Sequence, residues 1–160
     1  MNKKRTPLAL LLLGWMVLAS AQVQPGEIKR NNLYLEMFGS TGLYSVHYDR
    51  ILPTPAKWIQ FTAGAGLALS NNTTLDLPVH ASLLLGPRSG RLELGGGIQP
   101  EIYYYTEDAS EAQLIYFSRV GYSYQRRQGG FHFRFGVTPL YYPKVSWKSS
   151  WVALAFGWTF

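Results

Sequence analysis

The last ten residues of the chain, W-V-A-L-A-F-G-W-T-F, run from Trp151 to Phe160 and alternate between two kinds of side chain. One set is apolar and becomes more aromatic toward the end: Val152, Leu154, Phe156, Trp158 and Phe160. The intervening set is mostly small and includes Ala153, Ala155, Gly157 and Thr159. Successive residues of a strand point to opposite faces, so this period of two predicts a strand with one large apolar face.

The same alternation recurs in seven earlier segments, which gives eight expected strands. They span approximately residues 33–38, 43–51, 58–69, 75–85, 91–104, 114–124, 131–140 and 150–160. Such segments match a membrane crossing of ~10 residues, and bacterial single-chain barrels have even strand numbers. We therefore expect an all-β fold: one eight-stranded antiparallel up-and-down transmembrane β-barrel over residues 31–160. Loops 39–42, 70–74, 105–113 and 141–149 would lie at one end, with turns 52–57, 86–90 and 125–130 at the other.

Alternation alone does not decide which face points outward, and a soluble periplasmic ligand-binding barrel remains an alternative. The less apolar faces carry many small residues, such as Gly64, Gly66 and Ala155, which suit the cramped interior of a small barrel. That face also carries charges of both signs, which can pair across a lumen. The lumen is expected to hold a polar network of Glu36, His47, Asp49, Asp76, His80, Glu93, Glu101, Arg119, His132 and Arg134. The apolar face would then meet lipid.

Aromatic residues and prolines are placed consistently with this topology. Aromatic side chains cluster near the expected strand ends, as the two girdles of a membrane barrel do. Pro78, Pro100 and Pro139 interrupt three of the expected strands near one end of the barrel. Proline cannot donate to a sheet ladder, so irregular strand pairing is predicted at all three sites.

The C-terminal strand resembles the assembly signal of bacterial outer-membrane β-barrel proteins, with Phe156, Trp158 and Phe160 as its aromatic residues. The stretch from Leu33 to Arg50 resembles the first hairpin of uncharacterised small barrels of this type. The resemblance implies a Gram-negative outer-membrane location and a structural or surface-interaction role without catalysis. It also implies contact with outer-membrane lipid and lipopolysaccharide, and with the barrel-assembly machinery during insertion. A monomer is favoured, and no cofactor is expected.

The N-terminus predicts export. Lys3, Lys4 and Arg5 precede an apolar run, and Ala19 and Ala21 form a small-x-small cleavage site before Gln22. Residues 1–21 are therefore expected to be a signal peptide, and 22–30 a short periplasmic segment. Without the three cations of the leader, 12 Lys and Arg face 9 Asp and Glu, a net charge of +3. This modest charge gives no reason to expect nucleic-acid binding.

One constellation suggests an enzyme. His80 and Ser82 point to the same side of a strand, and Glu93 has the same parity across the next turn. These residue types resemble the H-x-S and Glu of outer-membrane lipid A deacylases, so a lipid-modifying hydrolase is an alternative function. The expected lumen position argues against it, since a lipid substrate would lie outside the barrel. The three histidines lack the local spacing of a metal site, and no metal is expected.

Overall fold

The computed structural model describes residues 28–56, 58–70, 74–87, 89–106, 109–143 and 149–160. The predicted signal peptide, its cleavage residues Ala19, Ala21 and Gln22, and most of the 22–30 segment lie outside these residues and stay predictions. Within the parts of the chain that the structure describes, no helix is long and apolar enough to cross a membrane.

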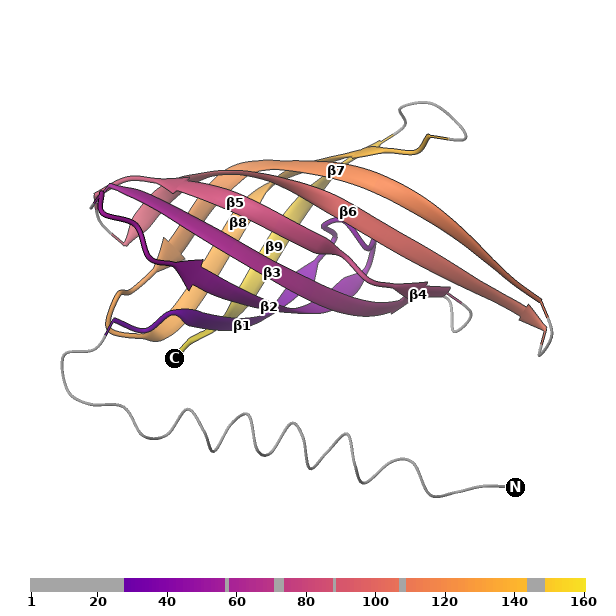
Figure 1. Ribbon diagram of the computed structural model, residues 1–160, viewed down its shortest axis with the longest axis horizontal. Coiled ribbons are helices and arrows are strands. Elements are labelled where there is room, and N and C mark those ends of the chain that lie inside the picture. The colour runs from indigo at the N-terminus through magenta and orange to yellow at the C-terminus, as the bar shows by residue number, and fades with distance from the viewer. Residues whose placement is uncertain (1–27, 57, 71–73, 88, 107–108, 144–148) are drawn as a thin grey trace, which may run out of the picture.

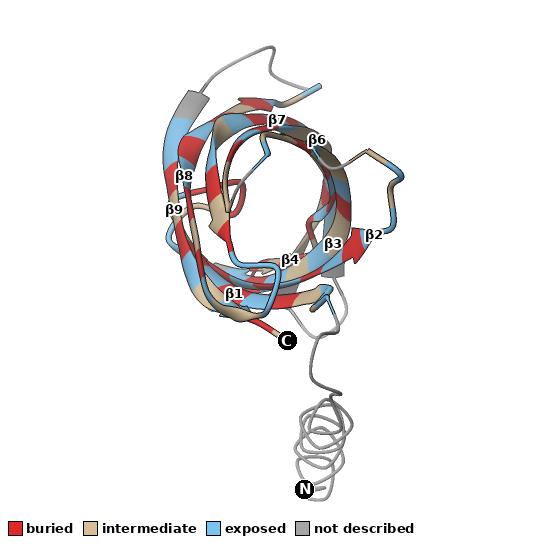
Figure 2. Cartoon of the chain, turned by 90° about the vertical axis from the view of Figure 1, so that its left-hand side faces the viewer, coloured by how far each residue is buried: buried red, intermediate tan, exposed pale blue. Residues whose placement is uncertain are grey.

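The chain forms a closed antiparallel barrel (Figures 1 and 2). Its strands are β1 (Asn31–Met37), β2 (Tyr44–Leu52), β3 (Ile59–Ser70), β4 (Thr74–Asp76), β5 (Val79–Leu85), β6 (Gly90–Thr106), β7 (Ala109–Gln125), β8 (Gly130–Tyr141) and β9 (Ser149–Thr159). Strands that follow one another in sequence pair, except that β4 and β5 each pair with both β3 and β6 and together occupy one position between them. The ring therefore has eight strand positions, which confirms the predicted fold class.

The barrel closes between its first and last strands. β1 pairs with β9 from Asn32 opposite Thr159 to Met37 opposite Leu154. Beyond that ladder, the Asn31 amide donates to the Phe160 carbonyl over 3.0 Å, and the Phe160 amide donates to the Asn31 carbonyl over 2.8 Å. The terminal residue thus completes the seam through its backbone.

The expected strand 75–85 is divided at Leu77 and Pro78. The register is the same on both sides of the gap, because Ala68 faces Asp76 and Ala65 faces Val79. The Pro78 carbonyl accepts from the Gly66 amide over 2.7 Å. The backbone N–H that proline lacks would have pointed to the same side, so the hydrogen bond that is lost is one to β3. The predicted irregularity at this proline is confirmed.

The other two prolines behave differently from each other. Pairing between β7 and β8 skips the positions around Pro139, as predicted. At Pro100 the predicted irregularity is found on one side only: β6 stays in regular register with β7, whereas its pairing with β4 stops at Glu101 and its pairing with β5 begins at Ile98. The Leu77 amide donates to the Pro100 carbonyl over 3.0 Å. The amide and carbonyl of one residue point to the same side of an antiparallel strand, so the N–H that proline lacks would have faced β4 and β5. The pairing of β6 with β7 therefore loses no hydrogen bond.

The hairpin of β6 and β7 is longer than expected and projects beyond the rest of the barrel (Figure 1). The sequence predicted a loop over 105–113, but pairing continues to Thr106 opposite Ala109. The predicted turn at 39–42 also differs from a solvated loop, because Ser40 and Thr41 are buried. An added Cβ at Gly39 would fall on the Glu36 carboxylate, so this turn packs against the lumen.

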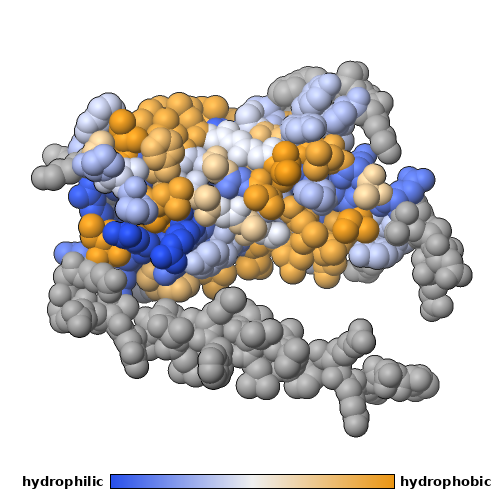
Figure 3. All heavy atoms as spheres, viewed as in Figure 1, coloured by the Kyte–Doolittle hydropathy of each residue, from blue (hydrophilic) through white to orange (hydrophobic). Residues whose placement is uncertain are grey.

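Burial alternates along the strands (Figure 2), and the sorting is inverted relative to a soluble protein. Side chains that point inward are largely polar or charged, among them Glu36, Asp49, Arg119 and Arg134. Large apolar side chains point outward on every long strand, and Figure 3 shows them over much of one face. The predicted assignment of the two faces is therefore observed. Arg50 is the exposed cation on the outward face of β2.

Candidate functional site

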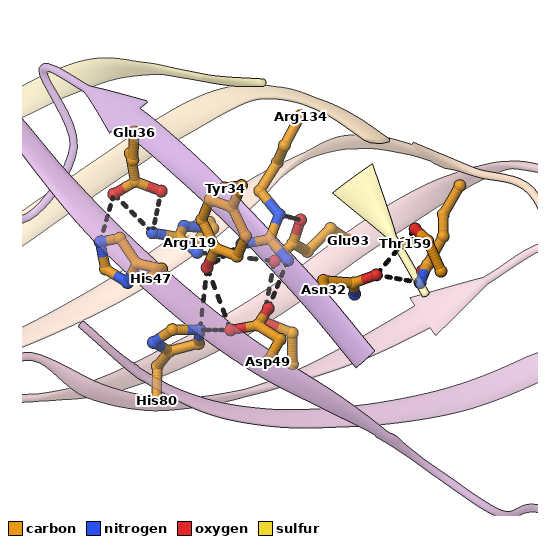
Figure 4. A network of polar contacts seen from close by, with 12 residues as sticks. Asn32, Tyr34, Glu36, His47, Asp49, His80, Glu93, Arg119, Arg134 and Thr159 are labelled. Atoms are coloured by element: carbon orange, nitrogen blue, oxygen red, sulfur yellow. Dashed lines mark hydrogen bonds and ion pairs between the residues drawn. The ribbon is translucent and has the colours of Figure 1, made fainter. Parts of the chain in front are cut away.

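Five charged side chains from five strands meet in the lumen (Figure 4). Glu36 comes from β1, Asp49 from β2, Glu93 from β6, Arg119 from β7 and Arg134 from β8. All five are at most 2 % exposed. Because strands far apart in the ring supply them, their ion pairs cross the lumen instead of running along one ladder.

Arg119 and Glu36 form the first of these pairs. Arg119 Nη2 donates to both Glu36 carboxylate oxygens, Oε1 over 2.8 Å and Oε2 over 2.6 Å. Arg119 Nη1 also lies 3.8 Å from Glu93 Oε1. Buried charges are costly unless paired and hydrogen-bonded, so the arrangement stabilises each charge while holding β7 against β1.

Arg134 occupies the centre of the network. Its Nη2 donates to Asp49 Oδ2 over 2.9 Å, and its Nε lies 2.7 Å from Glu93 Oε2. Its Nη1 donates to the Tyr34 hydroxyl over 2.7 Å, while the guanidinium carbon lies 4.7 Å from the centre of the same ring. One guanidinium therefore binds two carboxylates and a phenol, which ties β8 to β1, β2 and β6.

Tyr34 is a member of the central network that the sequence analysis did not name. Its hydroxyl donates to Asp49 Oδ1 over 3.1 Å and lies 3.2 Å from His80 Nε2. The ring is 2 % exposed and lies between the two sides of the network. The signal was present in the sequence, because position 34 has the same inward parity as Glu36.

The three histidines lie around Tyr34. His47 stacks on its ring with centroids 5.0 Å apart, and His132 meets it edge-on at 5.3 Å. His80 lies 5.4 Å from His47 and places Nε2 2.8 Å from Asp49 Oδ1. Within the described residues, no group of three or more His, Asp or Glu side chains is arranged to hold a metal ion. The imidazoles instead serve as ring and hydrogen-bond partners.

Two predicted members of the network lie apart from it. Asp76 faces Glu101 in the β4–β6 register, toward the projecting hairpin. Glu101 accepts from the Gln99 and Gln113 amides over 3.1 and 2.5 Å, and from the Tyr103 hydroxyl over 2.6 Å. The predicted set of ten thus divides into eight central residues and a separate acidic pair.

An apolar cluster and an amide cluster complete the interior, and the sequence indicated neither. Ile115, Phe117 and Leu140 are buried together, with Tyr142 against them. Near the opposite end, Asn32 Oδ1 accepts from Gln125 Nε2 over 2.6 Å and from Thr159 Oγ1 over 2.8 Å. The lumen therefore contains large apolar side chains in addition to the small and charged residues that were expected.

His80, Ser82 and Glu93 all point into the lumen, but they do not form a relay. Ser82 Oγ donates directly to Glu93 Oε1 over 2.8 Å, while the His80 Nε2 contacts are with Asp49 and Tyr34. A hydrolase triad requires the imidazole between serine and carboxylate. The observed order leaves the serine without an imidazole base and suits a structural hydrogen bond.

Glycines make room for the network. His47 lies opposite Gly66, Asp49 opposite Gly64, and Tyr34 opposite Gly157. An added Cβ at Gly66 would lie 2.5 Å from the His47 ring, and one at Gly157 2.4 Å from the Tyr34 Cβ. These glycines thus leave the space that the bulky interior side chains opposite them occupy.

Comparison with known proteins yields a single kind of match. No family model and no curated protein sequence matches the chain. Among solved structures, the N-terminal β-barrel domain of Pseudomonas aeruginosa OprF is similar, with a TM-score of 0.56 and 11 % sequence identity. The match covers 82 % of this chain and 96 % of that domain. At this identity the likeness shows the fold, a small closed β-barrel.

Proposed function

We propose that the chain is an integral outer-membrane β-barrel of a Gram-negative bacterium, with a structural or surface-interaction role and no catalysis. The observation that carries this proposal is the inverted sorting of side chains. Leu67 is 52 % exposed, Val79 51 % and Val152 51 %, whereas Glu36, Asp49 and Glu93 are at most 1 % exposed. In water such a surface would be unfavourable, and in lipid it is the expected arrangement.

The side chains at the two ends of the barrel also support a lipid surrounding. Trp58 and Trp158 are exposed at the end where the chain enters β1 and leaves β9, where Lys29, Arg30 and Arg127 also lie. Tyr44 and Tyr104 are exposed toward the other end. Exposed aromatic rings at two levels, with aliphatic side chains between them, fit the two interfaces of a bilayer. Lipid and lipopolysaccharide are therefore the proposed partners of the outer surface.

The lumen supports a structural role. Its charges are engaged with one another across the barrel, and the Ser82–Glu93 contact bypasses His80. An eight-stranded barrel has an interior just wide enough for side chains to fill. The network therefore acts as a cross-brace, and the surface loops are left for contact with other molecules. No large solute is expected to pass.

The test is fractionation of cells that express the chain, followed by electrophoresis with and without boiling. The expected result is recovery in the outer-membrane fraction after detergent extraction, with the folded band migrating differently from the boiled one. Recovery in the soluble periplasmic extract without detergent would refute the proposal. Hydrolysis of lipid A or phospholipid by the purified chain, abolished by Ser82→Ala, would refute the non-enzymatic part separately.

A further inference from the structure

A cavity lies at the end of the barrel where the chain enters β1. Its volume is ≈ 280 Å³. The wall combines apolar side chains, Ile51, Leu52 and Ile59 among them, with three arginines, Arg30, Arg91 and Arg127. Figure 3 shows strongly hydrophilic side chains gathered near this end of the molecule.

Arg91 is the buried member of the three. It is 4 % exposed, and its Nη1 donates to Gln60 Oε1. Within the described residues, no carboxylate lies at ion-pair distance from its guanidinium, in contrast to Arg119 and Arg134. A buried guanidinium without a counter-charge is costly, and a guanidinium has five N–H donors to satisfy. The position therefore calls for an anion.

Arg127 and Arg30 line the same cavity and add positive charge to it. Arg127 is near enough to Arg91 for the two like charges to interact unfavourably. Arg30 extends from the segment before β1, and both of these side chains are exposed. The three arginines come from three separate segments: the start of β6, the β7–β8 turn and the N-terminal segment. An anion that enters the cavity would be contacted from three sides.

The backbone holds these segments in place. The Lys29 amide donates to the Arg127 carbonyl over 3.0 Å, which fastens the N-terminal segment to the β7–β8 turn. The Ile51 amide donates to the Arg30 carbonyl over 2.7 Å, which fastens it to β2. The Gln125 amide donates to the Ser89 carbonyl over 2.8 Å and joins the end of β7 to the β5–β6 turn. The cavity is thus built on a hydrogen-bonded rim, so its cations converge without a large loss of backbone freedom.

We propose that this cavity is a phosphate-binding site, with Arg91 as its buried ligand and Arg30 and Arg127 as its outer ligands. Planar guanidinium groups bind phosphate oxygens through paired, charge-assisted hydrogen bonds. The phosphate belongs either to a soluble ion or ester or to the headgroup of a phospholipid at the adjacent interface. The site is separate from the central network, because Arg91 shares no ion pair with it among the described residues.

The first experiment measures binding of inorganic phosphate to the barrel purified from membranes in an uncharged detergent, by calorimetry and by ³¹P NMR line broadening. Saturable binding is expected, and Arg91→Gln should weaken it about tenfold or more. The matched control is Arg126→Gln, which removes an exposed arginine beside Arg127 that does not line the cavity. Arg126→Gln should bind phosphate as the unaltered chain does.

A second arm separates the two sources of phosphate. The same proteins are placed in bilayers of zwitterionic lipid with a minor fraction of an anionic glycerophospholipid, and the lipid retained after purification is quantified. Retention of anionic lipid that depends on Arg91, without binding of inorganic phosphate, assigns the site to a headgroup. Binding of inorganic phosphate without selective lipid retention assigns it to a soluble ligand.

Folding is checked in each variant by its shift on electrophoresis before and after boiling. If Arg91→Gln does not fold, Arg30→Gln takes its place, because Arg30 precedes β1, its side chain is exposed, and the substitution keeps the backbone hydrogen bond to Ile51. It should weaken binding in the same arm. The proposal is overturned if the folded Arg91 or Arg30 variant binds phosphate and retains anionic lipid as Arg126→Gln does, or if the unaltered chain does neither.

Discussion

Arg119 on β7 binds Glu36 on β1 across the lumen, and both Glu36 oxygens accept from Arg119 Nη2 at 2.8 and 2.6 Å. β8 and β9 separate these two strands in the sheet, so no backbone pairing joins them directly. The two residues are also 83 positions apart in sequence. The ion pair is therefore a cross-brace that constrains the cross-section of the barrel.

Because the two charges depend on each other, loss of one should destabilise the barrel more, relative to its share, than loss of both. Glu36→Gln or Arg119→Met alone leaves a buried charge without its main partner, so each should lower the free energy of unfolding by about 3–5 kcal/mol. The double variant removes both charges and should lose less than the sum of the two. Urea unfolding in lipid vesicles, followed by tryptophan fluorescence, measures all three. Additive losses would show that the two side chains act independently.

Removal of the Tyr34 hydroxyl should destabilise the barrel more than removal of the Tyr48 hydroxyl on the neighbouring strand. Tyr34→Phe removes a group that accepts from Arg134 and donates to Asp49, and should lower the free energy of unfolding by about 1–3 kcal/mol. The matched control is Tyr48→Phe, whose exposed hydroxyl donates to Asn31 Oδ1 over 2.8 Å. Its effect should stay within about 0.5 kcal/mol. Equal losses in the two variants would remove Tyr34 from the centre of the network.

The sequence predicted the barrel because period-two alternation is a local property. A strand such as β9 shows its two faces in ten residues, and the presence of both charge signs on one face indicated which side is the lumen. Strand ends were less predictable. The continuation of β6 past Tyr104, and of β7 before Leu114, depends on contacts such as Gln113 to Glu101, which join residues from two strands.

The composition of the network was predictable and its connections were not. Parity places Arg119 and Glu36 on the inner face, but which carboxylate each arginine binds depends on strand tilt and stagger around the ring. Those quantities arise only when the barrel closes. The cluster of Ile115, Phe117 and Leu140 was not predictable for a different reason. Apolar side chains can occupy either face of a barrel strand, so their presence in the sequence does not show that they point inward.

Gly66 predicts a loss of stability where backbone propensity alone would predict a gain. Alanine is favoured over glycine in a strand by roughly 0.5–1 kcal/mol. At Gly66, however, the new Cβ would lie 2.5 Å from the His47 ring, which is stacked on Tyr34. Gly66→Ala should therefore lower the free energy of unfolding by about 1–3 kcal/mol. The control Ala65→Gly makes the reverse exchange at the adjacent outward position and should cost about 0.5–1 kcal/mol. A stabilised Gly66→Ala variant would mean that His47 moves freely.

Replacement of the Phe160 ring should affect assembly in cells and leave stability in vitro nearly unchanged. Its backbone completes the β1–β9 seam through two hydrogen bonds with Asn31, while its ring is only partly buried. Phe160→Ser keeps both backbone bonds, so the refolded barrel should unfold within about 1 kcal/mol of the unaltered chain. In cells the same variant should accumulate less in the outer membrane if the terminal ring is read by the assembly machinery.

Deletion of Phe160 is the matched comparison for that prediction, because it removes the two seam hydrogen bonds together with the ring. It should reduce membrane accumulation as Phe160→Ser does, and should also lower stability in vitro by roughly 1–3 kcal/mol. Membrane fractionation and urea unfolding give the two readouts for each variant. Normal accumulation of Phe160→Ser would mean that the aromatic terminus carries no assembly signal, and that the last residue matters only through its backbone pairing with Asn31.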